Sequence, residues 1–421
     1  MKILFLTNLY PPFYIGGNEI CCKNVAVGLR SRGHNVRVLT STYKVNRKII
    51  DDCVYRCLNF GFGYKPLAAY NPFYLASKIN SDVKSFRTIL NDFKPDIIYI
   101  WGLFGISKYL LLEACNSNLP VAFELADEGL ANNIDGQADD DWFRFWSTVP
   151  QSIFLKLTKF IISILFGLHL NGLKLEREFN KKALKLINGC FVSADLMQRY
   201  ENRNVLFKNS LVIYNGIQTN IFYNKKIRQD DKILLILYVG QVAEHKGVHT
   251  AISALADIKK GGYSNFVFDI VGDGLYEYKE RLVKEINDFG ITEYVRFMGK
   301  KTIDELPDIY NSHHIFIFPS IWKEPFGLTI LEAMSTGMAV VGTATGGNKE
   351  FMADENNYLV FAPNDHNQLA RQLKRLINDN KLRNDIAKNA EETAKTFDVN
   401  MMVDKKEGFL NKIVLDWQAI K

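Results

Sequence analysis

Short apolar segments alternate with helical segments along the whole chain, and this alternation constrains the fold more than any other feature. Segments such as Glu19–Arg30 and Ile79–Phe93 have helical periodicity. Between such helices lie five predicted strands of the first half, rich in β-branched and aromatic residues: Ile3–Thr7, Asn35–Thr40, Asp96–Trp101, Val121–Leu125 and Gly189–Val192. This order is typical of a parallel sheet with helices on both faces.

The second half of the chain repeats the pattern. Its predicted strands are Ile233–Val239, Phe266–Val271, Val295–Met298, His314–Phe318 and Ala339–Val341. The turn at Asn215-Gly216-Ile217 and the polar run 224–231 between the halves indicate a linker. A chain of 421 residues is also too long for one ordinary core. We therefore expect two doubly wound α/β domains facing each other across a cleft, with ligands at the carboxyl ends of their strands.

Composition excludes several classes of protein. With 47% hydrophobic and 23% charged residues, the chain is typical of a globular protein. Its net charge of +6 is modest, and lysine and arginine are spread along the sequence instead of forming the basic stripe of a nucleic-acid-binding protein. The balance fits an anionic substrate or an anionic membrane surface equally well.

The six cysteines predict neither a metal site nor a disulfide framework. Cys53 and Cys57 could be interpreted as a ligand pair, but no second pair and no histidine cluster accompany them. Free thiols are typical of a reducing compartment. The opening Met1–Leu6 is too short for a signal-peptide core and fits a buried strand better. We expect a cytoplasmic protein without a metal or other cofactor.

One segment, 151–170, departs from the pattern. Its uninterrupted apolar part, from Phe160 to Leu168, is well short of the ~20 residues that span a bilayer. Lys156 and Lys159 lie at one end of it. Two interpretations remain open: a buried domain helix, or a peripheral contact with the inner face of a membrane or with the acceptor.

Two carboxylates flank a helix start in the segment Ser320–Met334. Glu324 lies in a Pro/Gly turn, and Glu332 lies on the helix that follows. Between them, Gly327 precedes a helix whose first backbone amides belong to Leu328 and Thr329. Free amides at a helix start bind anions such as phosphate. Carboxylates accept hydrogen bonds from sugar or ribose hydroxyl groups. The segment therefore predicts a ligand that carries both phosphates and hydroxyls.

Three glycine-containing segments point to the same half of the chain. Lys246-Gly247 follows the strand end Tyr238-Val239-Gly240 and opens a helix, which suits a diphosphate. Gly272-Asp273-Gly274 ends another strand, although alone it is also an ordinary turn. The paired Gly346-Gly347 follow a third strand and would let the backbone approach a ligand.

Taken together, these motifs resemble those of the retaining, nucleotide-sugar-dependent glycosyltransferases of family 4, which have the GT-B fold of two Rossmann-like domains. The carboxylate pair Glu324 and Glu332 matches in full within Pro319-Ser320…Glu324-Pro325-Phe326-Gly327…Glu332-Ala333-Met334. The other matching motifs, in family order, are Pro12…Gly16-Gly17-Asn18-Glu19, Arg32-Gly33-His34-Asn35-Val36, Val192-Ser193, Tyr214-Asn215-Gly216-Ile217, Lys246-Gly247, Val271-Gly272-Asp273-Gly274 and Gly346-Gly347…Glu350. The resemblance is strong from about Asn215 to Asp365 and poor from about Tyr43 to Leu186.

The resemblance implies transfer of a sugar from a UDP- or GDP-sugar to a hydroxyl acceptor, with retention and without an obligatory metal. Lys246 would neutralise the diphosphate leaving group, and Glu324 would hold the donor-sugar hydroxyls. Glu332 would bind the ribose. The implied donor-binding residues are Gly16, Gly17, Gln241, Gly272, Gly274, Phe326, Gly327, Leu328, Thr329 and Glu332. The implied domains are 1–215 on the acceptor side, 216–400 for the donor, and a closing helix, 401–421, that crosses back onto the first domain.

Two departures from the family pattern concern the reacting groups. Relatives usually have an arginine directly after the glycine at position 240, where this chain has Gln241. Many relatives have His-Asp after the fourth strand of the first domain, where this chain has Ala126-Asp127. Asp127 is thus the candidate catalytic residue of the first domain, and Glu124 and Glu128 are the two candidates to replace the histidine. Trp101 would line the acceptor or sugar side, with core packing as the alternative.

The sequence thus predicts a glycosyltransferase of surface polysaccharide or glycolipid biosynthesis that acts on a glycan or lipid-linked acceptor. Two alternatives on the same fold are a nucleotide-sugar epimerase or a glycan phosphorylase. A third is a non-catalytic subunit that binds a partner glycosyltransferase.

Overall fold

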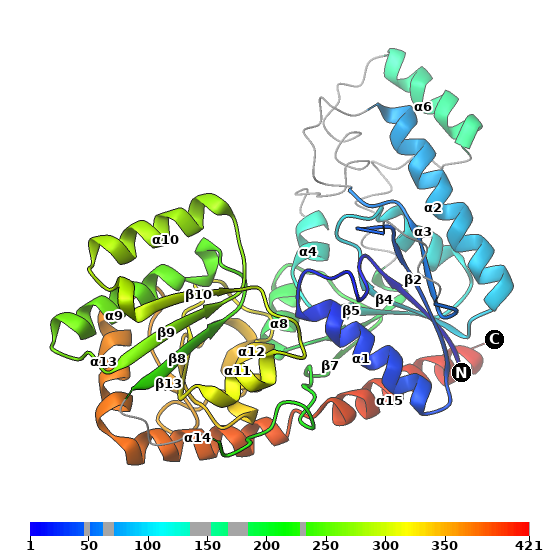
Figure 1. Ribbon diagram of the computed structural model, residues 1–421. Helices are drawn as coiled ribbons and strands as arrows, with labels where there is room; N and C mark the ends of the chain where they lie inside the picture. Colours follow the sequence, from blue (N-terminus) through cyan, green and yellow to red (C-terminus); the bar gives the residue numbers. More distant parts are fainter. Residues whose placement is uncertain (46–50, 62–70, 135–152, 167–183, 228–232, 421) are drawn as a thin grey trace. The chain divides into compact units, whose positions relative to one another are not determined.

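The computed structural model describes residues 1–45, 51–61, 71–134, 153–166, 184–227 and 233–420 (Figure 1). The chain forms two compact units. Unit 1 comprises Met1–Ile213 and Met402–Lys421, and unit 2 comprises Tyr214–Met401. The chain therefore passes from one unit to the other twice, at 213/214 and at 401/402, close to the junctions expected at 215/216 and 400/401.

Unit 1 is built on a parallel sheet of seven strands in the order β3-β2-β1-β4-β5-β6-β7. The strands are β1 (Lys2–Thr7), β2 (Asn35–Ser41), β3 (Val54–Leu58), β4 (Ile97–Gly102), β5 (Val121–Leu125), β6 (Ile187–Phe191) and β7 (Asn209–Val212). The central strands β5 and β6 are buried along their whole length. Continuous burial of this kind is typical of a parallel sheet covered on both faces.

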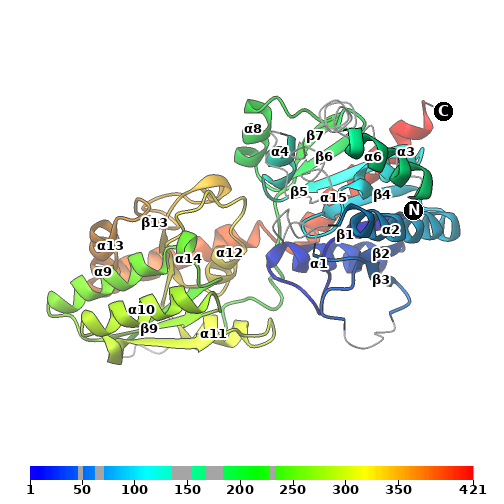
Figure 2. The same cartoon turned by 90° about the horizontal axis from the view of Figure 1, so that it is seen from above.

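The helices of unit 1 are α1 (Gly17–Ser31), α2 (Pro72–Phe93), α3 (Tyr109–Asn116), α4 (Gly129–Ile134), α6 (Ile153–Phe166), α8 (Ala194–Asn202) and α15 (Val399–Gln418). Helices α1 and α15 lie side by side, whereas α2 lies with α3 and α6 (Figures 1 and 2). Charged side chains connect α15 to the residues that directly follow α1. Arg32 pairs with Asp404 at 2.5 Å, and His34 Nε2 lies 2.7 Å from Glu407 Oε1.

Unit 2 is a second parallel sheet, of six strands in the order β10-β9-β8-β11-β12-β13. They are β8 (Leu234–Val239), β9 (Phe266–Val271), β10 (Val295–Gly299), β11 (Ile315–Phe318), β12 (Ala339–Gly342) and β13 (Leu359–Val360). The α-helices are α9 (Val248–Lys260), α10 (Tyr276–Asp288), α11 (Leu306–Ser312), α12 (Leu328–Ser335), α13 (His366–Asn378) and α14 (Asn380–Lys395). The 3₁₀ turns are η2 (Glu244–Lys246), η3 (Thr292–Tyr294) and η4 (Gly346–Glu350).

The strand order of each sheet reverses once, between β1 and β4 in unit 1 and between β8 and β11 in unit 2. At such a switch point, the connections from two neighbouring strands leave in opposite directions and open a crevice at the carboxyl ends of the strands. The loops after β1, β4, β8 and β11 are therefore the places where each unit can bind a ligand.

The prediction of two doubly wound α/β domains is confirmed, and all ten predicted strands are present. The sequence prediction missed β3, β7 and β13, which lie at or near the sheet edges. β7 is mostly exposed and β13 has only two residues, so neither has the continuous apolar pattern of a buried strand. The helix predicted over Val403–Lys421 is α15.

A backbone contact between neighbouring strand ends makes Gly272 sensitive to substitution. Gly272 has φ +143°, and a Cβ there would lie 1.8 Å from the Gly240 carbonyl oxygen. We expect Gly272→Ala to lower the free energy of unfolding by about 2–4 kcal/mol, because the backbone after β8 must move. Urea unfolding of both proteins measures the change.

Gly290→Ala is the matched control for this substitution. Gly290 also has a positive φ, +65°, but a Cβ added there would have no neighbour within 4 Å. Its cost should be only about 1 kcal/mol, from backbone conformation alone. A cost for Gly272→Ala no larger than that for Gly290→Ala would contradict the proposed backbone clash.

Candidate functional site

The loops after β8 and β11 meet at the switch point of unit 2. After β8 the chain forms η2, which ends at Lys246, and Gly247 then leads into α9. Gly247 has φ +70°, and a Cβ there would lie 2.0 Å from the carbonyl oxygen of Pro319, directly after β11. Only glycine permits this approach, so the glycine after Lys246 positions the lysine against the next loop.

Lys246 and Glu324 form an ion pair at this point. Lys246 Nζ lies 2.6 Å from Glu324 Oε1, and the Ser320 hydroxyl donates to the same oxygen at 2.6 Å. The Glu324 side chain is only 10% exposed, whereas the Lys246 side chain is 23% exposed. The carboxylate is thus held firmly by two donors, and the lysine keeps access to solvent for a further acceptor. Ser320 was not among the predicted site residues.

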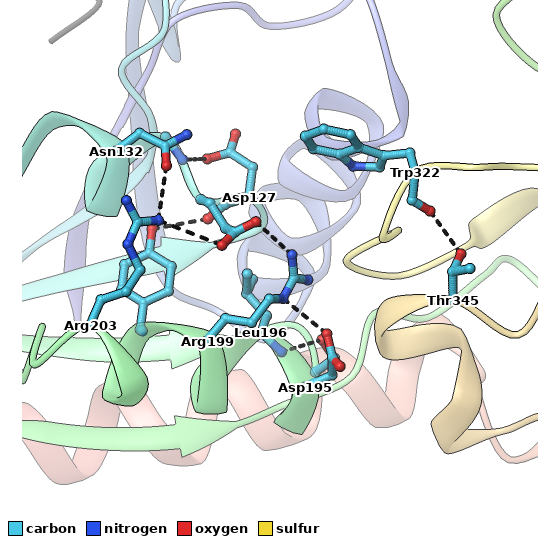
Figure 3. A network of polar contacts seen from close by, with 12 residues as sticks. Asp127, Asn132, Asp195, Leu196, Arg199, Arg203, Trp322 and Thr345 are labelled. Carbon is cyan, nitrogen blue, oxygen red and sulfur yellow. Dashed lines mark hydrogen bonds and ion pairs between the residues drawn. The ribbon is translucent and has the colours of Figure 1, made fainter. Parts of the chain in front are cut away.

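Backbone hydrogen bonds hold the loop that carries Glu324. The amides of Ile321 and Trp322 both donate to the His245 carbonyl oxygen, at 2.9 and 3.1 Å. The Thr345 hydroxyl donates to the Trp322 carbonyl oxygen at 2.7 Å (Figure 3). The Gly347 amide donates to the Glu324 carbonyl oxygen at 2.8 Å. The loop is therefore tied to the chain after β8 and to the turn after β12.

The paired glycines after β12 have a neighbour that the sequence did not indicate. Gly346 has φ +62°, and a Cβ there would lie 2.2 Å from the Glu324 carbonyl oxygen. The sequence suggested that these glycines let the backbone approach a ligand. In the structure they make room for the loop that carries Glu324, so their close contact is with the site's own backbone.

The start of α12 provides backbone donors beside this ion pair. Leu328 and Thr329 are the first two residues of α12, and the first amides of a helix have no acceptor within the helix. The preceding Gly327 amide donates to Asn348 Oδ1 at 2.7 Å. Phe326 is 9% exposed, and its ring centroid lies 5.8 Å from that of Tyr214 in a stacked arrangement. Phe326 therefore serves as a packing residue that supports the helix start.

Glu332 lies one turn into α12, where Tyr310 donates to it. The Tyr310 hydroxyl lies 2.9 Å from Glu332 Oε2. Burial raises the pKa of the Glu332 carboxyl to about 7, and the hydrogen bond from Tyr310 opposes part of this shift. Near neutral pH the group therefore changes charge readily. Tyr310 lies on α11, 22 residues before Glu332, and no sequence pattern pointed to it.

The loops after β8 and β9 run together at the same edge of the sheet. Val242 and Gly274 form a parallel bridge, and a Cβ on Gly274 would lie 1.7 Å from the Val242 carbonyl oxygen. The Tyr238 hydroxyl donates to the Gln241 carbonyl oxygen at 2.7 Å. The glycines of Gly272-Asp273-Gly274 thus permit close contact between two backbone segments. All the predicted donor-side residues of unit 2 lie in the loops of this one edge or at the start of α12.

In unit 1, Gly16 and Gly17 lie where α1 begins, beside the end of β4. The Gly16 amide donates to Glu19 Oε2 at 2.9 Å and caps the helix. The Asn18 side chain donates to the Trp101 carbonyl oxygen at 3.2 Å. The Asn8 amide donates to the Gly102 carbonyl oxygen at 2.9 Å. The glycine turn is thereby fixed at the switch point of unit 1.

Trp101 and Glu124 both point into the interior of unit 1. Trp101 is 1% exposed, and Lys406 Nζ lies 5.2 Å from its ring centroid. Lys406 Nζ also lies 2.6 Å from Glu124 Oε1, and the Tyr99 hydroxyl donates to Glu124 Oε2 at 2.5 Å. The side chains of Lys406 and Glu124 are both 0% exposed. This packing favours the core alternative for Trp101 and gives Glu124 an internal ion pair.

Asp127, labelled in Figure 3, and the next residue, Glu128, follow β5 and have different surroundings. Asp127 is exposed, and its Oδ1 accepts a hydrogen bond from the Gly129 amide at 2.7 Å. Glu128 Oε2 pairs with Arg199 NH1 at 2.7 Å, and Glu128 Oε1 lies 3.6 Å from Arg203 NH1. Arg199 also pairs with Asp195 at 2.9 Å. Of the three acidic residues predicted here, Asp127 is therefore the most accessible to a substrate.

The described residues form neither a metal cluster nor a membrane-spanning helix. Among them, no group of three or more His, Cys, Asp or Glu side chains is arranged to hold a metal ion. No helix in these parts of the chain is long and apolar enough to cross a membrane. Of the segment 151–170, only α6 falls within the described residues.

Comparison with known proteins gives one family match and several full-length relatives. Residues 220–393 match the family model of the glycosyl transferases group 1. An uncharacterised glycosyltransferase of Methanocaldococcus jannaschii is 25% identical over 93% of this chain and 92% of its own length. The lipopolysaccharide core biosynthesis glycosyltransferase LpsE of Rhizobium meliloti is 33% identical over 38% of this chain and 44% of its own length. Matches to several curated relatives span about half of their length or less.

Solved structures share the whole fold at low sequence identity. Sucrose-phosphate synthase from Thermosynechococcus elongatus has a TM-score of 0.72, at 18% identity over 99% of this chain and 100% of its own. HepE of Anabaena, solved in complex with UDP, has a TM-score of 0.67, at 20% identity over 98% of this chain and 100% of its own. Residues 220–393 are thus similar to the glycosyl transferases group 1, and the two-sheet fold of the whole chain is similar to that of sucrose-phosphate synthase and HepE.

Proposed function

We propose that this chain is a retaining, metal-independent glycosyltransferase of family 4. It transfers a sugar from a UDP- or GDP-sugar to a hydroxyl acceptor in surface polysaccharide or glycolipid biosynthesis. The observation that carries the proposal is the contact of Lys246 with Glu324 at the unit 2 switch point, beside the amides that open α12. One loop edge thus combines a cation, helix-start donors and carboxylate acceptors. A nucleotide-diphosphate sugar needs all three.

The leaving group determines what Lys246 does. In the transfer, the bond between the anomeric carbon and the phosphate oxygen breaks, and negative charge develops on the diphosphate. Lys246, whose side chain is 23% exposed, interacts through Nζ with a phosphate oxygen, while the Ser320 hydroxyl continues to hold Glu324. The amides of Leu328 and Thr329 add fixed donors. Donors that are already in place stabilise developing charge without reorganisation. We therefore propose that these protein groups, and not a metal ion, stabilise the negative charge of the diphosphate.

The two carboxylates of unit 2 bind hydroxyl groups at two different places. Glu324 accepts from the hydroxyls of the donor sugar through Oε2, since Lys246 and Ser320 both contact Oε1. Glu332, deeper along α12, accepts from the ribose hydroxyls. We assign the acceptor side to unit 1, where Asp127 provides an exposed carboxylate after β5. The acceptor oxygen forms the new bond to the anomeric carbon, and its proton passes to the phosphate oxygen that leaves.

The comparisons support a surface-glycan pathway and a UDP-sugar donor. LpsE acts in lipopolysaccharide core biosynthesis, and HepE was solved with UDP. An epimerase or a phosphorylase on the same fold would not need a hydroxyl acceptor. A non-catalytic subunit would have no use for the Lys246–Glu324 contact. The epimerase and the non-catalytic subunit are outcomes of the experiments below.

An apolar face on α6 supports peripheral contact with the inner face of a membrane, for a cytoplasmic enzyme with a lipid-linked acceptor. Five apolar side chains at helical spacing are between 38% and 66% exposed: Leu157, Phe160, Ile161, Ile164 and Leu165. Ile162, on the opposite side, is fully buried. A helix with one exposed apolar face can lie in the membrane interface, and the net charge of +6 favours anionic lipid.

Substitution of Lys246 tests the main proposal. The wild-type protein should melt at a higher temperature with UDP, UDP-glucose, GDP or GDP-mannose, because a ligand that binds only the folded state stabilises it. Lys246→Ala should abolish most of this shift and lower nucleotide-sugar turnover by a factor of about 10²–10³. Differential scanning fluorimetry and nucleotide-release assays measure the two effects.

Lys381→Ala is the control, because Lys381 is 87% exposed and its ion pair within the described residues is with Asp385 on α14. It should behave like the wild type. A wild-type protein that responds to no nucleotide would contradict the proposal and favour a non-catalytic subunit. Interconversion of two UDP-sugars without any acceptor would favour an epimerase.

The raised pKa of Glu332 predicts proton release on nucleotide binding. Ribose hydroxyls donate to the carboxylate, so the ligand favours the ionised form of a group whose pKa is about 7. At pH 7 binding should release up to about half a proton, and affinity should rise with pH up to about pH 7. Calorimetry in two buffers of different ionisation enthalpy measures the release. Glu332→Gln should abolish it, and the exposed Glu305→Gln should not.

The same shift affects the stability of the free protein. The ordinary pKa of a glutamate is 4.5, so between pH 4.5 and 7 the folded state holds a proton on Glu332 that the unfolded state has lost. The free energy of unfolding therefore falls as pH rises through this window. Glu332→Gln should remove that part of the slope. An unchanged slope would show that Glu332 titrates normally.

Vesicle binding tests the role of α6. The protein should float with vesicles of phosphatidylglycerol and phosphatidylethanolamine. The double variant Phe160→Asp/Ile164→Asp should lose at least tenfold in binding, because charges on the apolar face oppose insertion. Leu415→Asp, at a residue of α15 that is 65% exposed, is the control. Equal binding by both variants would rule out α6 as the contact.

A further inference from the structure

Trp322 exposes a large aromatic surface in the loop between β11 and α12. Its exposed fraction is 48%, in a loop whose other functional side chain, Glu324, is buried. An indole in contact with water forgoes the stabilisation that burial of so large an apolar surface provides.

The loop holds this indole in a fixed place. The Trp322 amide donates to the His245 carbonyl oxygen at 3.1 Å, and the Trp322 carbonyl oxygen accepts from the Thr345 hydroxyl at 2.7 Å (Figure 3). The His245 ring lies edge-on to the indole, with centroids 6.2 Å apart and an interplanar angle of 72°. Both backbone polar groups are satisfied, and an aromatic neighbour restrains the side chain. The exposed surface therefore belongs to an ordered residue.

The position of the indole relates it to the site already described. His245, against which it packs, directly precedes Lys246. Glu324, two residues after Trp322, receives Lys246 Nζ at 2.6 Å. The indole thus packs against the residue that precedes the cation assigned to the diphosphate, in the same loop as the carboxylate assigned to sugar hydroxyls.

We propose that Trp322 is a stacking surface for a pyranose ring, and that it determines which sugars the site accepts. The inference rests on the proposed glycosyltransferase function. A pyranose carries hydroxyls around its rim and C–H groups on its faces. The electron-rich face of an indole attracts the polarised C–H groups and shields the apolar face of the sugar from water, while Glu324 binds rim hydroxyls. The ring is that of the donor sugar or the terminal sugar of the acceptor.

A comparison of nucleotide with nucleotide sugar tests the donor. The gain in affinity of UDP-glucose over UDP, measured by calorimetry, isolates the contribution of the sugar. Trp322→Ala should reduce this gain about fivefold to twentyfold and leave the affinity for UDP unchanged. Trp322→Phe should restore most of it, because a phenyl ring keeps an aromatic face. If the wild-type protein binds guanosine nucleotides more tightly than uridine nucleotides, GDP and GDP-mannose are used in place of UDP and UDP-glucose.

Octyl β-glucopyranoside tests the acceptor. Saturation-transfer NMR with the UDP-loaded protein reports contact between an aromatic side chain and the glucoside C–H groups. Loss of this signal in Trp322→Ala, with the donor affinities unchanged, would assign the stacked ring to the acceptor. If the wild type gives no such signal, the donor comparison alone decides.

Phe289→Ala is the control, because Phe289 is another exposed aromatic residue of unit 2, at the end of α10. It should match the wild type in every measurement. The proposal is overturned if Trp322→Ala stays within twofold of the wild type in both arms, or if it weakens UDP as much as UDP-glucose. If the wild-type protein binds no nucleotide at all, the proposed glycosyltransferase function is wrong, and this result is distinct from a failure of the Trp322 proposal alone.

Discussion

The order of the strands in unit 2 determines where its chemistry can occur. Because β8 and β11 are neighbours in the sheet although β9 and β10 separate them in sequence, the loops that follow them emerge at one point. Lys246 and Glu324 are 78 residues apart in the chain and 2.6 Å apart in space for this reason. The glycines around them serve the same constraint, since Gly247 and Gly346 each have a backbone oxygen where a Cβ would be. The site depends on backbone packing before any side chain contributes.

The two units use charge in opposite ways. In unit 2, the ion pair of Lys246 and Glu324 is open to solvent on the lysine side, so a ligand can exchange with one partner. In unit 1, Lys406 and Glu124 are fully enclosed, and Tyr99 completes their contacts. A buried pair of this kind costs much to break, because either charge alone would be left without water or partner. The first arrangement suits binding, and the second fastens a helix.

The sequence predicted the fold well where burial is continuous. β5 and β9 were predicted with their observed bounds, because their residues are apolar except for Glu124 and Asp269 and nearly all of them are buried. Edge strands such as β7 lack that signal. At the site, the spacing of Glu324 and Glu332 and the start of α12 could be read locally. Their partners Ser320 and Tyr310 could not be predicted, because no local sequence pattern indicates which acceptor a hydroxyl group in a loop or helix will contact. Glu124 was interpreted as a site residue because it lies near the position of the family's histidine. Its partner, Lys406, lies 282 residues later, so the sequence did not indicate the ion pair.

That long separation has a consequence for how the protein is made. A ribosome releases β5 long before it synthesises α15, so the nascent first unit carries Glu124 without its cation and a sheet face without its last helix. Unit 2, whose residues are contiguous, can fold as soon as Met401 has emerged. Of the two units, unit 1 is therefore completed after unit 2. A premature stop within residues 402–421 would remove part of unit 1, the unit whose other residues are translated first.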